Sequence, residues 1–98
     1  MSEQRVLEIK KDDQTIISKE WDFEAMCIVD DVRASNPEAG KLRMTNDAIH
    51  YLFTGTNATN EVIKGLTVED HATLALKVFN WYLNDIDKAL KNVQSLLP

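Results

Sequence analysis

The stretch TVEDHATLALKVFNWYLNDIDKALKNVQSLLP, residues Thr67–Pro98, predicts one long amphipathic helix, and this helix decides the fold. After Val68 the main apolar residues recur at the helical period and fall within a sector of about 120°. This main stripe comprises Ala72, Ala75, Leu76, Phe79, Tyr82, Leu83, Ile86, Leu90, Val93 and Leu97. Thr67, with Asp70 three residues later, resembles a capping box and favours a helix start at this point.

The length of this helix and a second apolar strip beside the main stripe both predict a contact with another protein. An unbroken helix would be about 42 Å long, whereas a compact domain of this size has a radius of gyration of only about 13 Å. The second strip, called the flank below, comprises Leu74, Val78, Trp81 and Ala89. An apolar surface wider than one core needs suits a partner helix or a second copy of the chain. We therefore take the flank as the candidate protein interface; for Trp81, a place in the core is the alternative.

The residues before this helix predict a small β-hairpin and two or three shorter helices. The expected elements are strands at about 6–9 and 15–18 and helices at about 22–34, 45–55 and 60–64. Asp22 can cap the first of these helices, Thr45 the second, and Gly55 can close the second with a left-handed turn. The chain is therefore expected to be a single domain, residues 1–98, of the α+β, mainly α class. It has an N-terminal β-hairpin followed by three to four helices with a long C-terminal amphipathic helix.

Charge and hydropathy argue against nucleic-acid and membrane partners. The net charge is −5, and residues 1–40 carry ten acidic and only five basic side chains. Nucleic-acid binders need a basic patch, but Lys10-Lys11 is followed at once by Asp12-Asp13. No apolar run approaches the roughly 20 residues that span a bilayer. The N-terminus has no apolar signal segment and the chain has a single cysteine, so we expect a cytoplasmic protein.

The reactive side chains are few, and their spacing predicts no catalytic, cofactor or metal site. Cys27 is the only cysteine, so no zinc-ligand spacing can be written with it. Asp30 and Asp31 follow it, and their charge should raise the pKa of the thiol and disfavour the nucleophilic thiolate. His50 and His71 fall on different predicted helices, and there is no glycine-rich phosphate loop. The protein is therefore expected not to be an enzyme and to need no cofactor.

The first two thirds of the chain resemble a family of assembly factors. A hairpin that leads into WDFEAMCIVDD (residues 21–31), then AIHYLFTG (residues 48–55) and a long helix, is similar to the small tail assembly chaperones of long-tailed bacteriophages and prophages. Phe23, Ala25 and residues 28–31 match the apolar and acidic pattern of the family, whereas SNPEAG and the length of the last helix do not align. The resemblance implies a non-enzymatic helper without a cofactor. It would bind tape measure or tail tube proteins in the bacterial host cell.

Three functional classes remain open from the sequence. The first is an assembly chaperone or adaptor with protein partners, which could also form a homo-oligomer. The second is an acidic regulatory protein, an antitoxin or inhibitor, that binds and masks a basic protein partner, and the acidic N-terminal part fits it. The third is a small enzyme, and the lack of a reactive constellation argues against it.

Overall fold

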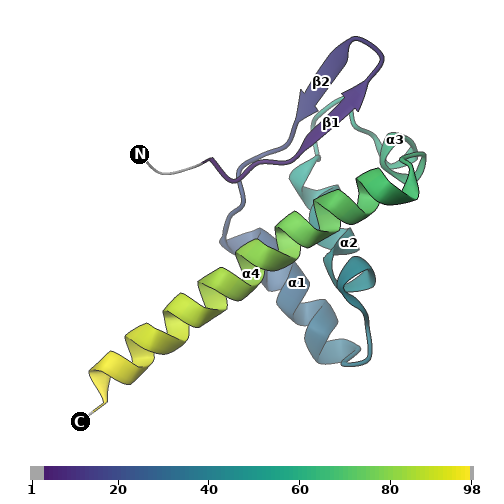
Figure 1. Ribbon diagram of the computed structural model, residues 1–98. Coiled ribbons are helices and arrows are strands. Elements are labelled where there is room, and N and C mark those ends of the chain that lie inside the picture. The colour runs from purple at the N-terminus through teal and green to yellow at the C-terminus, as the bar shows by residue number, and fades with distance from the viewer. Residues whose placement is uncertain (1–3, 98) are drawn as a thin grey trace.

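The computed structural model describes residues 4–97, and this part of the chain is mainly helical (Figure 1). The elements in chain order are β1 (Glu8–Lys11), β2 (Gln14–Ile17), α1 (Phe23–Ser35), α2 (Lys41–Leu52), α3 (Asn60–Lys64) and α4 (Val68–Leu96). This order confirms the predicted fold class, an N-terminal hairpin followed by helices. The last helix, α4, runs without a break for 29 residues, as its periodicity predicts.

β1 and β2 form a two-stranded antiparallel sheet whose apolar face lies on the core. Ile9 pairs with Ile16 across the sheet, and both side chains are buried. Burial of one face stabilises a hairpin that would be marginal alone in water. The turn residue Asp12 has a φ of 55°, a left-handed conformation that aspartate adopts more readily than most residues. Beyond the strands, the Trp21 N–H donates to the Arg5 carbonyl at 2.8 Å, so the pairing continues toward α1.

Side-chain caps set the start of three of the helices. Asp22, Thr59 and Thr67 precede α1, α3 and α4, and each accepts a hydrogen bond from the backbone N–H three residues later. These bonds satisfy amides that the first turn of a helix leaves without a partner. The predicted starts of these three helices are therefore confirmed.

The start of α2 differs from the prediction. The helix begins at Lys41, four residues before the predicted cap Thr45, and Gly40 is its N-cap without a side-chain hydrogen bond. The Thr45 hydroxyl instead donates to the carbonyls of Lys41 at 2.9 Å and Leu42 at 3.3 Å. A threonine that bonds back to carbonyls three and four residues earlier belongs to the interior of a helix. The predicted cap is therefore a buried interior residue.

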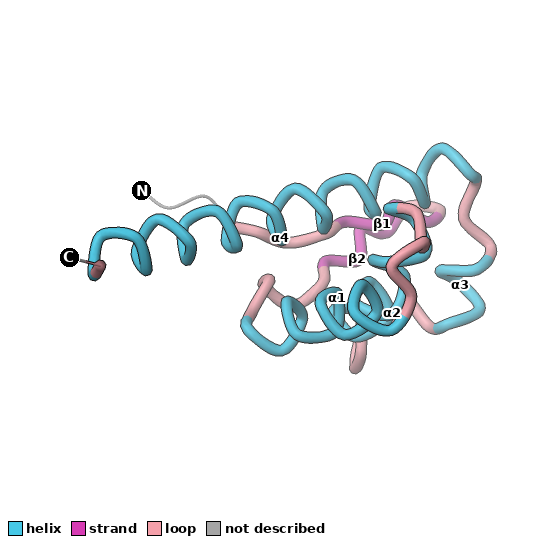
Figure 2. Tube along the Cα trace, turned by 90° about the horizontal axis from the view of Figure 1, so that it is seen from below, coloured by secondary structure: helices cyan, strands magenta, loops and turns pink. Residues whose placement is uncertain are grey.

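The helices form two layers with the core between them. α2 packs against both α1 and α4, and Figure 2 shows α4 lying across the layer that α1 and α2 make. The buried apolar residues form one cluster, whose largest members are Tyr82, Phe53, Leu7, Ile49 and Leu52. The C-terminal part of α4 runs past the other elements and projects from the molecule (Figures 1 and 2). The described residues accordingly extend 56 × 36 × 22 Å.

Candidate functional site

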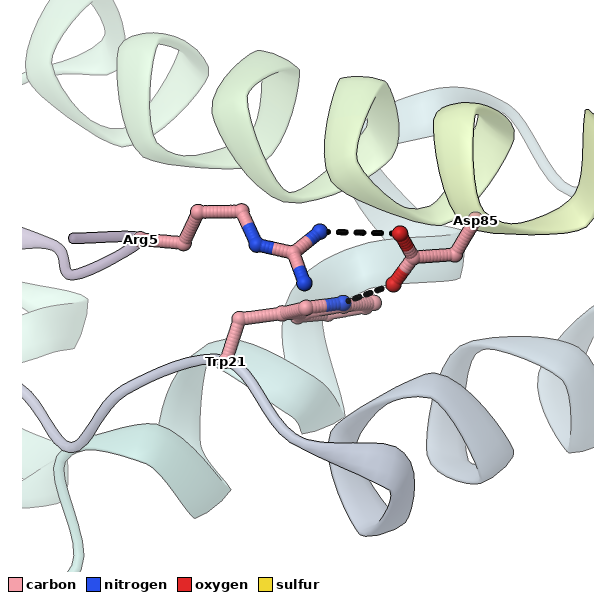
Figure 3. A network of polar contacts seen from close by, with 3 residues as sticks. All are labelled: Arg5, Trp21 and Asp85. Atoms are coloured by element: carbon pink, nitrogen blue, oxygen red, sulfur yellow. Dashed lines mark hydrogen bonds and ion pairs between the residues drawn. The ribbon is translucent and has the colours of Figure 1, made fainter. Parts of the chain in front are cut away.

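Asp85, in the second half of α4, binds two residues that lie far away in the sequence (Figure 3). Arg5 Nη1 donates to Asp85 Oδ1 at 2.9 Å, and Trp21 Nε1 donates to Asp85 Oδ2 at 2.8 Å. Partial burial alone would raise the pKa of Asp85, but the hydrogen bonds from Trp21 and Arg5 outweigh it and hold the pKa below its ordinary value. Both carboxylate oxygens are therefore engaged within the chain. They tie α4 to the segment that precedes α1.

A second polar cluster joins α4 to α1 through Tyr82. The Tyr82 hydroxyl donates to Asp30 Oδ1 at 2.6 Å and accepts from Arg33 Nη1 at 3.2 Å. Burial of the ring and the bond to Asp30 raise the pKa of the Tyr82 phenol. Asp30 is thus part of the contact between the two helices. Asp30 lies three residues after Cys27 in the sequence, but neither of these hydrogen bonds involves Cys27.

Cys27 and the histidines form no reactive arrangement within residues 4–97. Cys27 is half-buried, and burial together with the neighbouring carboxylates raises the pKa of its thiol, which disfavours the thiolate. His50 Nδ1 lies 2.7 Å from Asn60 Oδ1 at the surface. In the described part of the chain, no three His, Cys, Asp or Glu side chains gather as they would around a metal ion. The side chains that remain as candidates are those that could bind a protein.

The fold places the four residues of the flank, which the sequence indicates as an interface, in different surroundings. Leu74 and Val78 are only 4% and 0% exposed and belong to the core, which corrects the view of these two residues as surface. The reason is that α2 and the segment around Trp21 cover this side of α4. Trp81 is half-buried and packs against the core, with its ring centroid 5.9 Å from that of Trp21. Ala89, by contrast, is exposed on the projecting part of α4.

A different face of α4 is left uncovered. Four of its residues, Leu76, Leu83, Leu90 and Val93, are between 42% and 56% exposed, and the C-cap residue Leu97, which follows the helix with an extended backbone, is 64% exposed. Phe79 and Ile86, between them in the sequence, are partly buried at the edge of the core. The fold therefore covers only part of the main stripe. The main stripe and the flank together are wider than the surface that α1, α2 and the N-terminal segment cover.

These seven residues, called the seam below, have a spacing that is itself informative. They are Leu76, Phe79, Leu83, Ile86, Leu90, Val93 and Leu97, so that the steps alternate strictly between three and four. This alternation is the spacing of the a and d positions where two helices pack along each other. The alternation can be read from the sequence. The main stripe does not reveal it, because its sector of about 120° contains both the seam and residues of the core.

An open groove of about 830 Å³ lies between the first turns of α2 and α4, and it is the second candidate surface. Its lining residues are Val32, Gly40, Lys41, Leu42, Arg43, Asn46, Asp47, Val68, His71 and Ala72. Leu42 and Val68 are 51% and 83% exposed, so the groove offers uncovered apolar side chains. Lys41 and Arg43 add positive charge at the N-terminus of α2, whose first turn has neither an acidic residue nor a side-chain cap. The helix dipole has the same sign there.

The sequence gives no direct signal for this groove, because its residues come from the ends of three helices that only the fold brings together. No helix within residues 4–97 combines the length and the apolar character needed to cross a membrane. Comparisons with protein-family models, curated protein sequences and solved structures find no match for the chain. The resemblance to tail assembly chaperones therefore stays a prediction. The functional proposal below depends on the groove and on the seam.

Proposed function

We propose that this chain is a non-enzymatic assembly chaperone or adaptor that binds a segment of another protein in the groove between α2 and α4. The family resemblance supplies the class of client, the tail tube or tape measure protein of a bacteriophage or prophage in its bacterial host. The observation that carries the proposal is the pairing of exposed apolar side chains, Leu42 and Val68, with the cations Lys41 and Arg43.

The apolar part of the groove sets the scale of the affinity. Covering a fully exposed leucine or valine gains roughly 1.5–3 kcal/mol, so Leu42 and Val68 together supply on the order of 3 kcal/mol. A micromolar complex needs about 8 kcal/mol, and the remainder must come from the charged rim and the other lining residues. We therefore expect binding in the micromolar range. Such an affinity suits a factor that must release its client after assembly.

The charge of the groove determines which segment it fits. Asp47 is the one acidic residue of its lining, against the cations Lys41 and Arg43, in a chain whose net charge is −5. A local surface of opposite sign to the whole chain selects a partner through complementary charge. The client segment is therefore expected to be amphipathic, with an apolar side that covers Leu42 and Val68 and carboxylates that meet the two cations.

No specific feature of the described residues supports the alternative, an acidic protein that masks a basic partner. Three of its carboxylates, Asp22, Asp30 and Asp85, accept side-chain hydrogen bonds from the chain itself. The groove, in turn, has the wrong sign of charge for a basic partner. We therefore retain the chaperone or adaptor as the proposed function.

Co-expression of the N-terminally tagged chain with the tail tube and tape measure proteins of the same genome tests this proposal. The expected result is a soluble complex with one of them, with a dissociation constant in the micromolar range when the purified proteins are titrated. Leu42→Glu and Val68→Asp should each weaken the complex at least tenfold, because each places a charge in a contact that should be apolar. Both substitutions put an acidic residue in the first turn of a helix, where the dipole favours it, so the fold should persist.

Phe23→Asp is the matched control. Phe23 is 77% exposed and also lies in the first turn of a helix, but it does not line the groove. The control should bind the client as the wild type does. The proposal fails if no complex forms with either client, or if the groove variants and the control lose the same affinity.

A further inference from the structure

We infer that the seam of α4 pairs in antiparallel orientation with the seam of a second copy of the chain. This inference goes beyond the proposed function, because the seam and the groove share no residue and the pairing needs no client. The first support is the spacing itself. Every a and d position from Leu76 to Val93 is apolar, so that residues 76–96 of α4 form three complete heptads without an interruption, and Leu97 follows as the C-cap of the helix.

The area of the seam is the second support. Its five most exposed residues keep about half of their surface uncovered in the single chain. Together with the partly exposed Phe79 and Ile86, they leave on the order of 600 Å² for each copy to cover, or about 1,200 Å² for the pair. This value reaches the lower bound for specific protein interfaces and exceeds that of most crystal-packing contacts. Full coverage of the seam would therefore bring the pair to the lower end of the range for specific interfaces.

The position of the seam on α4 makes it accessible to a second copy. The buried residues Val78 and Tyr82 face the other elements of the chain, and the centre of the seam is turned by roughly 100° from Val78 and roughly 60° from Tyr82 around the helix. The C-terminal part of α4, which carries the last members of the seam, projects beyond the rest of the molecule (Figure 1). The elements of the same chain do not reach this part. A second α4 can pack along this part without displacing α1 or α2. At Phe79 it also meets Lys41 of α2, whose Nζ lies 5.4 Å from the centroid of that ring.

The residues that border the seam favour a second copy over a different helix. Coiled coils that select unlike partners use charges at the bordering e and g positions. Here these positions hold Asn80, Tyr82, Asp87, Ala89, Gln94 and Leu96. Asp87 is the single charged residue among them, and Lys91 of the same helix neutralises it at 3.1 Å. The bordering e and g positions therefore carry no unbalanced charge that would oppose the pairing of identical helices or select another partner.

The choice of residues within the seam favours the antiparallel orientation. Leucine occupies every a position, and Phe79, Ile86 and Val93 occupy the d positions. In parallel assemblies, leucine at a with isoleucine at d shifts the preference from two strands to three or four, so a two-stranded pair of this seam is expected to be antiparallel. In an antiparallel pair, a leucines of one helix pack beside d residues of the other. The orientation also separates residues 1–66 of the two copies, which carry a net charge of −4 each (12 acidic, 8 basic).

Sedimentation velocity of the purified full chain over a wide concentration range tests the pairing. The expected species has twice the chain mass of 11.2 kDa and dissociates on dilution. Leu90→Glu with Val93→Glu should raise the dissociation constant at least about 100-fold, because two central apolar contacts are replaced by charges. The control, Asn92→Glu with Ser95→Glu, adds the same charge to the other side of the same exposed helix and should leave the dissociation constant within about threefold.

A single-cysteine variant tests the orientation. With Cys27→Ser in the background, Val93→Cys places one thiol at a d position inside the seam. In a parallel pair the two thiols face each other across the interface, whereas in the antiparallel pair they lie about 15 Å or more apart, too far for a disulfide. We expect no disulfide-linked dimer under oxidation. A rapidly formed disulfide-linked dimer overturns the orientation.

A wild-type chain that stays at 11.2 kDa at the highest concentration in the sedimentation experiment, or a control that dissociates like the seam variant, overturns the pairing.

Discussion

Asp85→Asn should lower the stability of the fold far more than a similar change two residues further along α4. The asparagine keeps one oxygen that can accept a hydrogen bond, so one of the two bonds from Arg5 and Trp21 is lost and the other loses its charge. Hydrogen bonds to charged groups contribute about 1.5–3 kcal/mol each. Trp21 is only 5% exposed, so its indole N–H has little access to water as a substitute acceptor.

We therefore expect the free energy of unfolding to fall by about 2 kcal/mol, which corresponds to roughly 10 °C in Tm for a domain of this size. Urea denaturation followed by tryptophan fluorescence measures the change, at one fixed protein concentration because association would add to the stability. Asp87→Asn is the control. Its salt bridge with Lys91 is exposed, so it should change the stability by less than about 0.5 kcal/mol. Equal effects of the two substitutions would refute the role given to Asp85.

The lowered pKa of Asp85 predicts how the stability of the fold changes with pH. This pKa is lower in the folded chain than in the unfolded chain, where it is about 3.9, so the unfolded chain binds more protons in this range. The stabilisation from Asp85 is complete above about pH 5 and is lost as the pH falls through the unfolded and then the folded pKa. The difference between the wild type and Asp85→Asn should therefore shrink in acid. A difference that stays constant down to pH 3 would contradict this assignment.

Three further outcomes are expected. Trp81→Ala should cost about 2–3 kcal/mol in thermal or urea denaturation, because it uncovers Trp21 at the edge of the core; unchanged stability together with a lower mass would place Trp81 in an interface instead. Cys27→Ser should leave stability and client binding unchanged, and the native thiol should react with a labelling reagent at neutral pH no faster than a cysteine peptide does. Duplex DNA should show no submicromolar, salt-sensitive binding in a gel-shift titration, because the basic residues are dispersed among acidic ones.

The features of the fold that depend on neighbouring residues could be predicted from the sequence. Asp22 and Thr67 cap their helices as predicted, since a cap needs only the next three residues. Thr45 shows where this reasoning ends. The same hydroxyl can cap a helix or bond back within one, and only the start of α2 at Lys41 decides between the two.

The features that depend on tertiary packing could not be predicted. The apolar sector of α4 is wider than the covered surface, so periodicity alone could not place Leu74 and Val78 inside and Leu90 outside. Asp85 is hydrogen-bonded to Trp21 and Arg5, which lie 64 and 80 positions earlier in the sequence, and no local pattern predicts such distant pairs. The seam is the exception, since its strict alternation of three and four residues can be read from the sequence.

The most direct test of the proposed function is hydrogen-exchange mass spectrometry of the chain with and without its client. The first turns of helices exchange readily in the free chain, because they fray. If the client lies in the groove, protection should rise at residues 41–47 of α2 and 68–72 of α4, while residues 23–27 of α1 stay unchanged. Protection at 23–27 with none at 41–47 and 68–72, or no change in any segment under conditions where a complex forms, would contradict binding in the groove.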